Sequence, residues 1–305
     1  MVRIRRSWIV FGLLVAFTAL MSMHQTVLAQ DEPYRNPDLP VEERVEDLLA
    51  RMTLEEKIGQ MTLIEKNSLT PADVTNLFIG GVLSGGGGYP NPNTPEAWAD
   101  MVRSFQEGAL ASRLGIPIIY GVDAVHGHNN VYGAVIFPHN VGLGATRNLE
   151  LVQQIAQITA QEMIATGIYW DYAPVLAVVQ DIRWGRTYEA YGENTELVTE
   201  LSTAFIHGLQ GDGLGTPGSV LATPKHYLGD GGTEWNTSPF GENHNDRGVT
   251  IGDEAFVRNT FLPPYIAAVE AGAMSVMPSY SSWGGLHMHE QHYLISEVLE
   301  GELGF

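Results

Sequence analysis

Four short segments of the sequence concentrate residue types that could bind or transform a ligand. They are Gly121–Asn130 (GVDAVHGHNN), Asp181–Glu189 (DIRWGRTYE), Lys225–Gly232 (KHYLGDGG) and Met277–Trp283 (MPSYSSW). Apolar, β-favouring runs precede these segments, as expected for loops at the ends of strands. If the strands are parallel, their carboxyl ends share one edge of the sheet, and the four segments would line one pocket.

The first two segments supply charged groups suited to polyhydroxylated ligands. Asp123 follows an apolar strand, and its carboxylate could accept hydrogen bonds from two neighbouring hydroxyls of a sugar. Arg183 and Arg186 flank an indole, and a guanidinium can hold hydroxyls or carboxylates with its planar fork. Alternatively, Asp123 caps a turn and the arginines form a structural cluster with nearby acids.

The other two segments supply a cation, an imidazole and aromatic rings. Lys225 and His226 precede a glycine-rich stretch whose backbone could approach a ligand closely. Tyr280 and Trp283 could stack on the apolar face of a pyranose. The alternatives are an exposed Lys-His pair in a turn and aromatic side chains buried in the core.

Two histidine pairs suggest a different chemistry, a metal-dependent hydrolase. His126 and His128, and likewise His287 and His289, have the spacing of ligand pairs, and Asp123 could complete a site. Pairs of this kind are more often structural, so this interpretation is secondary.

Composition excludes several classes of function. The chain has 305 residues, with 16 Lys and Arg against 35 Asp and Glu, a net charge of −19. Such an acidic protein repels phosphate backbones, which argues against binding nucleic acid. The absence of cysteine excludes disulfides, thiolate metal sites and a cysteine nucleophile.

The amino terminus has the pattern of a secretory signal peptide. Arg3, Arg5 and Arg6 precede the apolar run Trp8–Leu20, and Val27-Leu28-Ala29 is a small-residue cleavage pattern. We expect residues 1–29 to be removed and residues 30–305 to be secreted to the periplasm or the extracellular space, free of the membrane. An uncleaved membrane anchor is the alternative, but the apolar run is short for a spanning helix.

Strands and helices are predicted to alternate along residues 30–305. Expected strands are Thr62–Ile64, Gly81–Leu83, Ile116–Val122, Ile168–Pro174, Ser219–Thr223 and Met274–Pro278. Expected helices are Val41–Met52, one opened by the capping box of Thr53 and Glu56, Pro95–Ser112, Asn148–Thr166, Asn194–Leu209, and Asp253–Glu270 interrupted at Pro263-Pro264.

This alternation predicts an α/β fold with a parallel sheet, best matched by a (β/α)8 barrel that is incomplete at its carboxyl end, with about six of eight strands. A doubly wound sheet is the alternative, weakened because no Gly-x-Gly-x-x-Gly follows the first strand. The run Gly85–Gly88 lacks the Lys-Ser/Thr of a phosphate-binding loop and is interpreted as a flexible turn.

Seven motifs in a fixed order resemble the amino-terminal barrel of glycoside hydrolase family 3. After Leu54–Met61 they are GVDAVHGHNNV, IFPHNVGLGATRN, TGIYWDYAPVLAV, RWGRTYEAYGEN, KHYLGDGGT and EAGAMSVMPSYSSW. The resemblance is closest to β-glucosidases and exo-β-glucan glucohydrolases. It implies retaining hydrolysis of terminal β-glucosyl residues from β-glucosides or gluco-oligosaccharides, with no metal or organic cofactor.

The resemblance also assigns residues to the glucose-binding set. Asp123, Arg186, Lys225 and His226 match the family's hydroxyl-binding residues, and Tyr280 matches the tyrosine beside the nucleophile. The chain departs from the usual family residues at Ala177, Ile182 and Ala190, which affects loop shape more than sugar contacts. Asp230 stands where the hexosaminidase branch has a histidine acid, which favours glucosides as substrates.

The resemblance places neither catalytic carboxylate within this chain. The family's nucleophile is an Asp in a strand that begins just after a Glu-Leu-Gly-Phe segment, and here that segment is residues 302–305. The acid/base lies in a second α/β domain farther on. We therefore expect the chain to be the amino-terminal part of a β-glucosidase and to be inactive alone. A non-catalytic sugar-binding module is a further alternative.

Overall fold

The computed structural model describes residues 32–305, so the expected signal peptide lies outside the described residues. The chain divides into two compact units, one ending at Gln60 and the other running from Met61 to Phe305. Each unit is considered by itself.

The first unit is helical. It contains a short 3-10 turn η1 (Pro33–Arg35), helix α2 (Val41–Arg51) and helix α3 (Leu54–Gln60). The predicted capping box is confirmed, because the Thr53 N–H donates to Glu56 Oε2 at 2.8 Å and the Glu56 N–H donates to Thr53 Oγ1 at 3.3 Å. These two bonds satisfy backbone donors at the start of α3, where a helix has no intrahelical acceptors.

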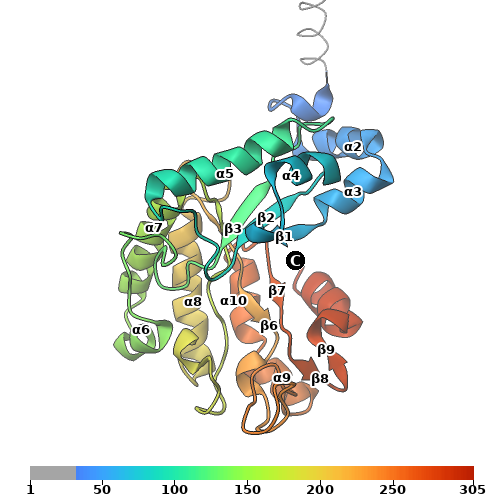
Figure 1. The fold of residues 1–305 in the computed structure, drawn as a ribbon. Helices are drawn as coiled ribbons and strands as arrows, with labels where there is room; N and C mark the ends of the chain where they lie inside the picture. Colours follow the sequence, from blue (N-terminus) through green and yellow to red (C-terminus); the bar gives the residue numbers. More distant parts are fainter. Residues whose placement is uncertain (1–31) are drawn as a thin grey trace, which may run out of the picture. The chain divides into compact units, whose positions relative to one another are not determined.

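The second unit is built on a parallel sheet (Figure 1). Its five strands pair in chain order: β1 (Leu63–Glu65), β2 (Gly81–Ser84), β3 (Ile119–Val122), β4 (Trp170–Asp171) and β5 (Leu221–Ala222). Beyond β5 the chain continues as β6 (Lys225–Tyr227), which pairs in parallel with β7 (Met277–Pro278). The six predicted strands are therefore present, but the paired segments of several are shorter than expected.

Proline explains where the regular strands are cut short. Pro117, Pro174 and Pro224 lie at or near strand ends, and proline has no N–H to donate to a ladder. Contact between the chain segments nevertheless continues past these positions. The Leu176 N–H donates to Lys225 O at 2.7 Å, and the Met277 N–H donates to Pro224 O at 3.1 Å. Among the described residues the strands form open sheets, and no closed barrel is present.

The helices of the second unit lie between successive strands. They are α4 (Pro71–Leu77), α5 (Pro95–Leu110), α6 (Asn140–Thr146), α7 (Leu149–Ala165), α8 (Thr195–Gln210), α9 (Glu254–Thr260) and α10 (Pro263–Glu270). Side chains of Thr94, Asn148, Asn194 and Asp253 cap α5, α7, α8 and α9. Helix α8 packs against both α7 and α10 (Figure 1). The short helices α4 and α6 were not predicted from the sequence.

Several short elements complete the unit. They are the 3-10 turns η2 (Lys66–Ser68), η3 (Thr187–Glu189), η4 (Asp230–Gly232) and η5 (Met288–Glu290), the antiparallel pair β8 (Ser282–Trp283) and β9 (Leu286–His287), and the π-helix η6 (Tyr293–Glu302). Two of the turns, η3 and η4, lie in the segments predicted to bind a ligand.

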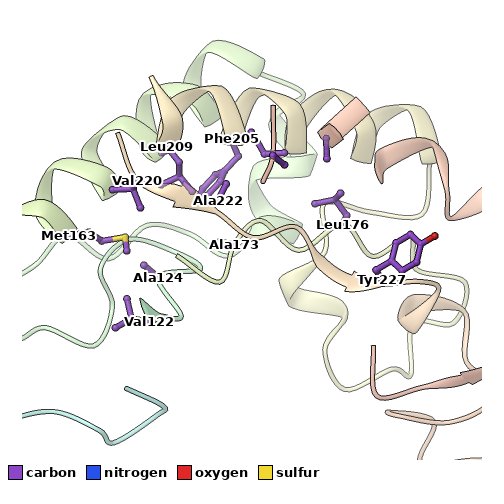
Figure 2. Packing of buried hydrophobic residues seen from close by; sticks show 14 of the residues in the cluster. Val122, Ala124, Met163, Ala173, Leu176, Phe205, Leu209, Val220, Ala222 and Tyr227 are labelled. Carbon is purple, nitrogen blue, oxygen red and sulfur yellow. The ribbon is translucent and has the colours of Figure 1, made fainter. Parts of the chain in front are cut away.

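The hydrophobic core of the second unit lies between the sheet and its helices. Figure 2 shows Phe205 and Leu209 of α8 beside Ala222 of β5. The close approach of α7 and α8 requires Gly208, since a Cβ there would collide with the backbone oxygen of Gln153. This packing fixes the strands whose carboxyl ends carry the polar residues. No helix in the described part of the chain has the length and apolar character needed to cross a membrane.

Candidate functional site

A cavity of about 290 Å³ lies at the carboxyl ends of β6 and β7. Its lining residues are Arg186, His226, Asp230, Asp246, Arg247, Met277, Pro278, Ser279 and Tyr280. The lining thus combines charged groups of both signs, an imidazole and one aromatic ring. The volume of the cavity is close to the lower limit for small-ligand pockets, roughly 300 Å³.

Three of these lining side chains, together with Glu189, form a continuous hydrogen-bonded chain. Arg186 donates from Nε to Glu189 Oε1 at 2.8 Å and from Nη2 to Glu189 Oε2 at 2.6 Å. Its Nη1 lies 3.2 Å from His226 Nε2, and His226 Nδ1 lies 2.7 Å from Asp230 Oδ2. The guanidinium and the imidazole are thus held in fixed orientations before any ligand arrives.

The donors in this chain can be assigned atom by atom. A guanidinium can only donate, so His226 Nε2 must accept from Arg186 and its Nδ1 must carry the hydrogen that goes to Asp230. Burial alone would raise the pKa of Glu189, but the bonds from Arg186 keep that pKa below its ordinary value. Burial opposes the charge of Arg186, and Glu189 more than compensates, so the pKa of the guanidinium is raised. The ion pair stays charged.

Asp123 and Lys225 form a second charged pair. Asp123 directly follows β3, and Lys225 begins β6; the Lys225 ammonium donates to Asp123 Oδ1. The Lys225 side chain is only 3% exposed, whereas that of Asp123 is 46% exposed. The exposed part of the Asp123 carboxylate is therefore accessible to a ligand, and the buried Lys225 ammonium balances its charge. Neither residue lines the cavity itself, but Lys225 immediately precedes His226 in β6.

A third carboxyl group, Asp171, is buried beneath this pair at the end of β4. Its Oδ1 accepts from the Ala124 N–H at 2.9 Å, which fixes the residue next to Asp123. Its Oδ2 has no hydrogen-bond partner among the described residues. Burial raises the pKa of Asp171 well above its ordinary value, and this outweighs the opposing attraction of Lys225.

Tyr280 lies at the exposed mouth of the cavity. Tyr280 follows β7 in the chain, and the Arg247 guanidinium lies over the Tyr280 ring, 5.2 Å from the ring centroid. Arg247 is also 3.9 Å from Asp246, which accepts from the Trp184 indole at 3.1 Å. Trp184 is buried, so the indole anchors the loop that carries Asp246 and Arg247.

The histidine pairs that suggested a metal site have separate partners. His126 Nδ1 lies 3.0 Å from Phe137 O, and His128 Nε2 lies 2.9 Å from Thr166 Oγ1. The rings of His287 and His289 stack on one another at 5.4 Å. Between residues 32 and 305 there is no group of three or more His, Asp or Glu side chains that could hold a metal ion.

The structure thus brings together Arg186, His226 and Tyr280 in one cavity and pairs Asp123 with Lys225. Sequence reasoning did not single out Asp246, Arg247 or Asp171 as site residues. Asp246 and Arg247 lie in a segment rich in Gly and Asn that indicates only a loop. Asp171 did carry a signal, since it is a lone acid inside an apolar strand.

The fold and the site define a class: an α/β protein with a parallel sheet and a polar cavity, lined by charged groups of both signs, at the carboxyl ends of its strands. Residues 53–305 match the family model described as glycosyl hydrolase family 3 N terminal domain. The chain belongs to this family, which confirms the resemblance seen in its motifs.

Individual relatives agree with this assignment. The chain is 35% identical to a lysosomal beta glucosidase of Dictyostelium discoideum, with 86% of this chain and 34% of the relative covered. It is 32% identical to a periplasmic beta-glucosidase of Salmonella typhimurium, covering 86% and 32% of the two chains. A crystal structure of a mutant exo-1,3/1,4-beta-glucanase from a Pseudoalteromonas species is similar at a TM-score of 0.81 and 41% identity, over 89% of this chain and 44% of that one. The chain spans about a third of the length of these two curated relatives.

Proposed function

We propose that this chain supplies the glucosyl-binding site of a retaining β-glucosidase, which hydrolyses terminal non-reducing β-D-glucosyl residues from β-glucosides and gluco-oligosaccharides. The observation that carries the proposal is the preorganised chain Glu189–Arg186–His226–Asp230, of which Arg186, His226 and Asp230 line a small cavity. Positively charged donors and negatively charged acceptors suit neutral polyols, because every hydroxyl can both donate and accept a hydrogen bond.

In this proposal five residues contact the sugar. Asp123 accepts hydrogen bonds from neighbouring hydroxyls, Lys225 and Arg186 donate to hydroxyl oxygens, and His226 completes the polar wall. Tyr280 packs beside the reacting carbon. The names of the two beta-glucosidase relatives and of the exo-glucanase support this choice of substrate.

The fold in this proposal is the amino-terminal (β/α)8-type barrel. The five parallel strands β1 to β5 and the separate parallel pair of β6 and β7 within residues 61–305 support it. Retaining hydrolysis needs a nucleophile and an acid/base whose carboxyl groups lie about 5 to 5.5 Å apart. In this proposal the nucleophile follows the segment Glu302–Phe305 in the parent enzyme, and the acid/base belongs to a further α/β domain.

Glucose binding to the purified chain tests the proposal. Titration calorimetry should show saturable binding of D-glucose, and Arg186→Ala and Arg186→Lys should each weaken it by about tenfold or more, since one charge-assisted hydrogen bond contributes on the order of 1.5 to 3 kcal/mol. Arg183 is the matched control. It lies three residues away and pairs with Asp181 at 2.5 Å, outside the cavity lining. Arg183→Ala should bind glucose as the parent does, and equal losses for Arg183 and Arg186 variants would overturn the site.

We also propose that the protein is secreted, to the periplasm or the extracellular space, after cleavage following Ala29. The amino-terminal pattern and the periplasmic relative from Salmonella typhimurium support this. Amino-terminal sequencing of the exported protein should begin at Gln30; recovery of an exported chain that begins at Met1 or Val2 would contradict it.

A further inference from the structure

Helix α6 packs closely against η3, the short turn that ends at Glu189. Gly144 of α6 approaches the chain after this turn so closely that a Cβ there would lie 1.8 Å from Tyr191 O. The ring of His139, the residue before α6, contacts the Tyr188 ring edge-on, with 4.7 Å between the centroids. The chain on both sides of Glu189 is therefore held by α6 and the residue that precedes it.

Asn140, the first residue of α6, contacts Glu189 itself. Asn140 is only 3% exposed, and its Nδ2 donates to Glu189 O at 2.8 Å. A carbonyl oxygen can only accept, so the amide must present Nδ2 to it. Asn140 Oδ1 has no hydrogen-bond partner within the described part of the chain. A buried amide thus holds a main-chain atom that lies 49 positions away in the sequence.

Glu189 transmits this restraint to Arg186. The Glu189 main-chain N–H donates to Arg186 O at 2.9 Å, and the Glu189 carboxylate accepts from Arg186 Nε at 2.8 Å and Nη2 at 2.6 Å. The remaining main-chain group of Glu189, its carbonyl, is the one that Asn140 holds. Because the Arg186 guanidinium lines the cavity, a displacement of the Glu189 main chain would also displace a group that faces the ligand.

We propose that Asn140 is a positioning residue for glucosyl binding. It fixes the main chain of Glu189, and Glu189 in turn holds the Arg186 guanidinium in the orientation that the sugar requires. The inference rests on the proposed function, because that function assigns Arg186 to the sugar. Asn140 does not line the cavity, so loss of its donor weakens binding by displacing the guanidinium and not by removing a sugar contact.

Gln210 provides a matched control for Asn140. It is 5% exposed, and its Nε2 donates to Gly272 O, 62 positions away, at 3.1 Å. This contact joins the end of α8 to the chain after α10, and neither residue lines the cavity. Asn140→Asp and Gln210→Glu each remove a buried amide donor from a distant carbonyl and add a carboxyl group, so both should lower the thermal midpoint.

Glucose binding to the purified chain separates positioning from stability. In titration calorimetry at a temperature where circular dichroism shows each protein folded, Asn140→Asp should weaken D-glucose binding about fivefold or more, and Gln210→Glu should bind it within about twofold of the parent. Asn140→Ala and Gln210→Ala remove the same donors without adding a carboxyl group and repeat the comparison for variants that fold more readily. Folded Asn140 variants that bind glucose as the parent does, or equal losses at the two positions, would overturn the positioning role.

A double-mutant cycle shows whether Asn140 acts through Arg186. Once Arg186→Ala has removed the guanidinium, adding Asn140→Ala should weaken glucose binding by less than about twofold more, because the two residues serve one contact. Independent, additive losses would overturn the inference and leave glucose binding, and with it the proposed function, intact. If the folded parent chain binds no glucose, the proposed function itself fails, and the positioning role fails with it.

Discussion

Asp171 shows how burial changes the chemistry of a single residue. Its carboxyl group is fully buried, accepts one hydrogen bond from the Ala124 N–H and leaves Oδ2 without a partner among the described residues. Because burial raises the pKa of Asp171 well above its ordinary value, the carboxyl group keeps its proton to higher pH than an exposed aspartate does. Its role is then to hold the loop that carries Asp123, with Lys225 left to pair with Asp123 alone.

Substitutions at Asp171 distinguish the contribution of its hydrogen-bond acceptor to stability from that of its charge. Asp171→Asn keeps the acceptor for Ala124 and should change the free energy of unfolding at pH 7 by less than about 1 kcal/mol. Asp171→Leu leaves the buried Ala124 N–H unpaired and should cost about 1 to 3 kcal/mol. Urea unfolding checks both. An Asn variant as unstable as the Leu variant would show that the negative charge is needed.

The pH dependence at Asp171 has a definite sign. The unfolded carboxyl loses its proton near pH 4, whereas the folded group keeps it to higher pH, so this residue makes stability fall as pH rises from about 4 toward the folded pKa. Asp171→Asn should remove that contribution. The thermal midpoint of Asp171→Asn, compared with that of the parent, should therefore rise from pH 4 to pH 7. A constant difference between the two proteins would contradict a raised pKa of Asp171.

At the scale of elements, a buried histidine joins the loop after β3 to the end of α7. Thr166, the residue that follows α7, donates from Oγ1 to Met163 O at 2.8 Å, so the same oxygen must accept from His128 Nε2 at 2.9 Å. His128 is therefore protonated on Nε2, and Nδ1 has no partner within the described chain. Burial lowers the pKa of His128 to about 4.

The contact between His128 and Thr166 makes the stability of the protein depend on pH in the acid range. The unfolded ring binds a proton below about pH 6.5, but the folded ring does so only near pH 4, so the stability that His128 supplies is present above pH 6.5 and is lost as pH falls. The loss amounts to about 3 kcal/mol by pH 4. His128→Gln should flatten the decline of the unfolding free energy between pH 6.5 and 4, whereas a His207→Gln control at an exposed position of α8 should follow the parent. Parallel curves for all three proteins would show that the ring is not kept neutral.

At the scale of the whole molecule, binding and hydrolysis are expected to be separable. In the proposal, residues 30–305 hold the glucosyl residue, and neither catalytic carboxylate belongs to this range. A protein that consists of residues 30–305 should bind glucose but release no chromophore from an activated aryl β-glucoside. Reproducible turnover that is abolished by changing one acidic residue within this range would show that the nucleophile has been misplaced.

Local sequence patterns were sufficient to predict most elements. The Thr53–Glu56 capping box, the starts of the helices at Asn148 and Asn194 and the break at Pro263-Pro264 all occur where predicted. These features depend on hydrogen bonds between residues a few positions apart, so the sequence alone specifies them. The missed helices α4 and α6 have seven residues each and are too short to show a clear apolar period.

The motifs also determined the family, because they preserve residue order along the chain. What only the tertiary structure decided is which side chains meet: Lys225 reaches Asp123 across 102 positions, and Arg186 reaches His226 across 40. Such contacts depend on strand order and helix packing, which no short segment encodes. For the same reason the burial of Asp171 and the position of Arg247 between two rings could not be predicted, since a pKa and a cation–π contact arise from neighbours distant in sequence.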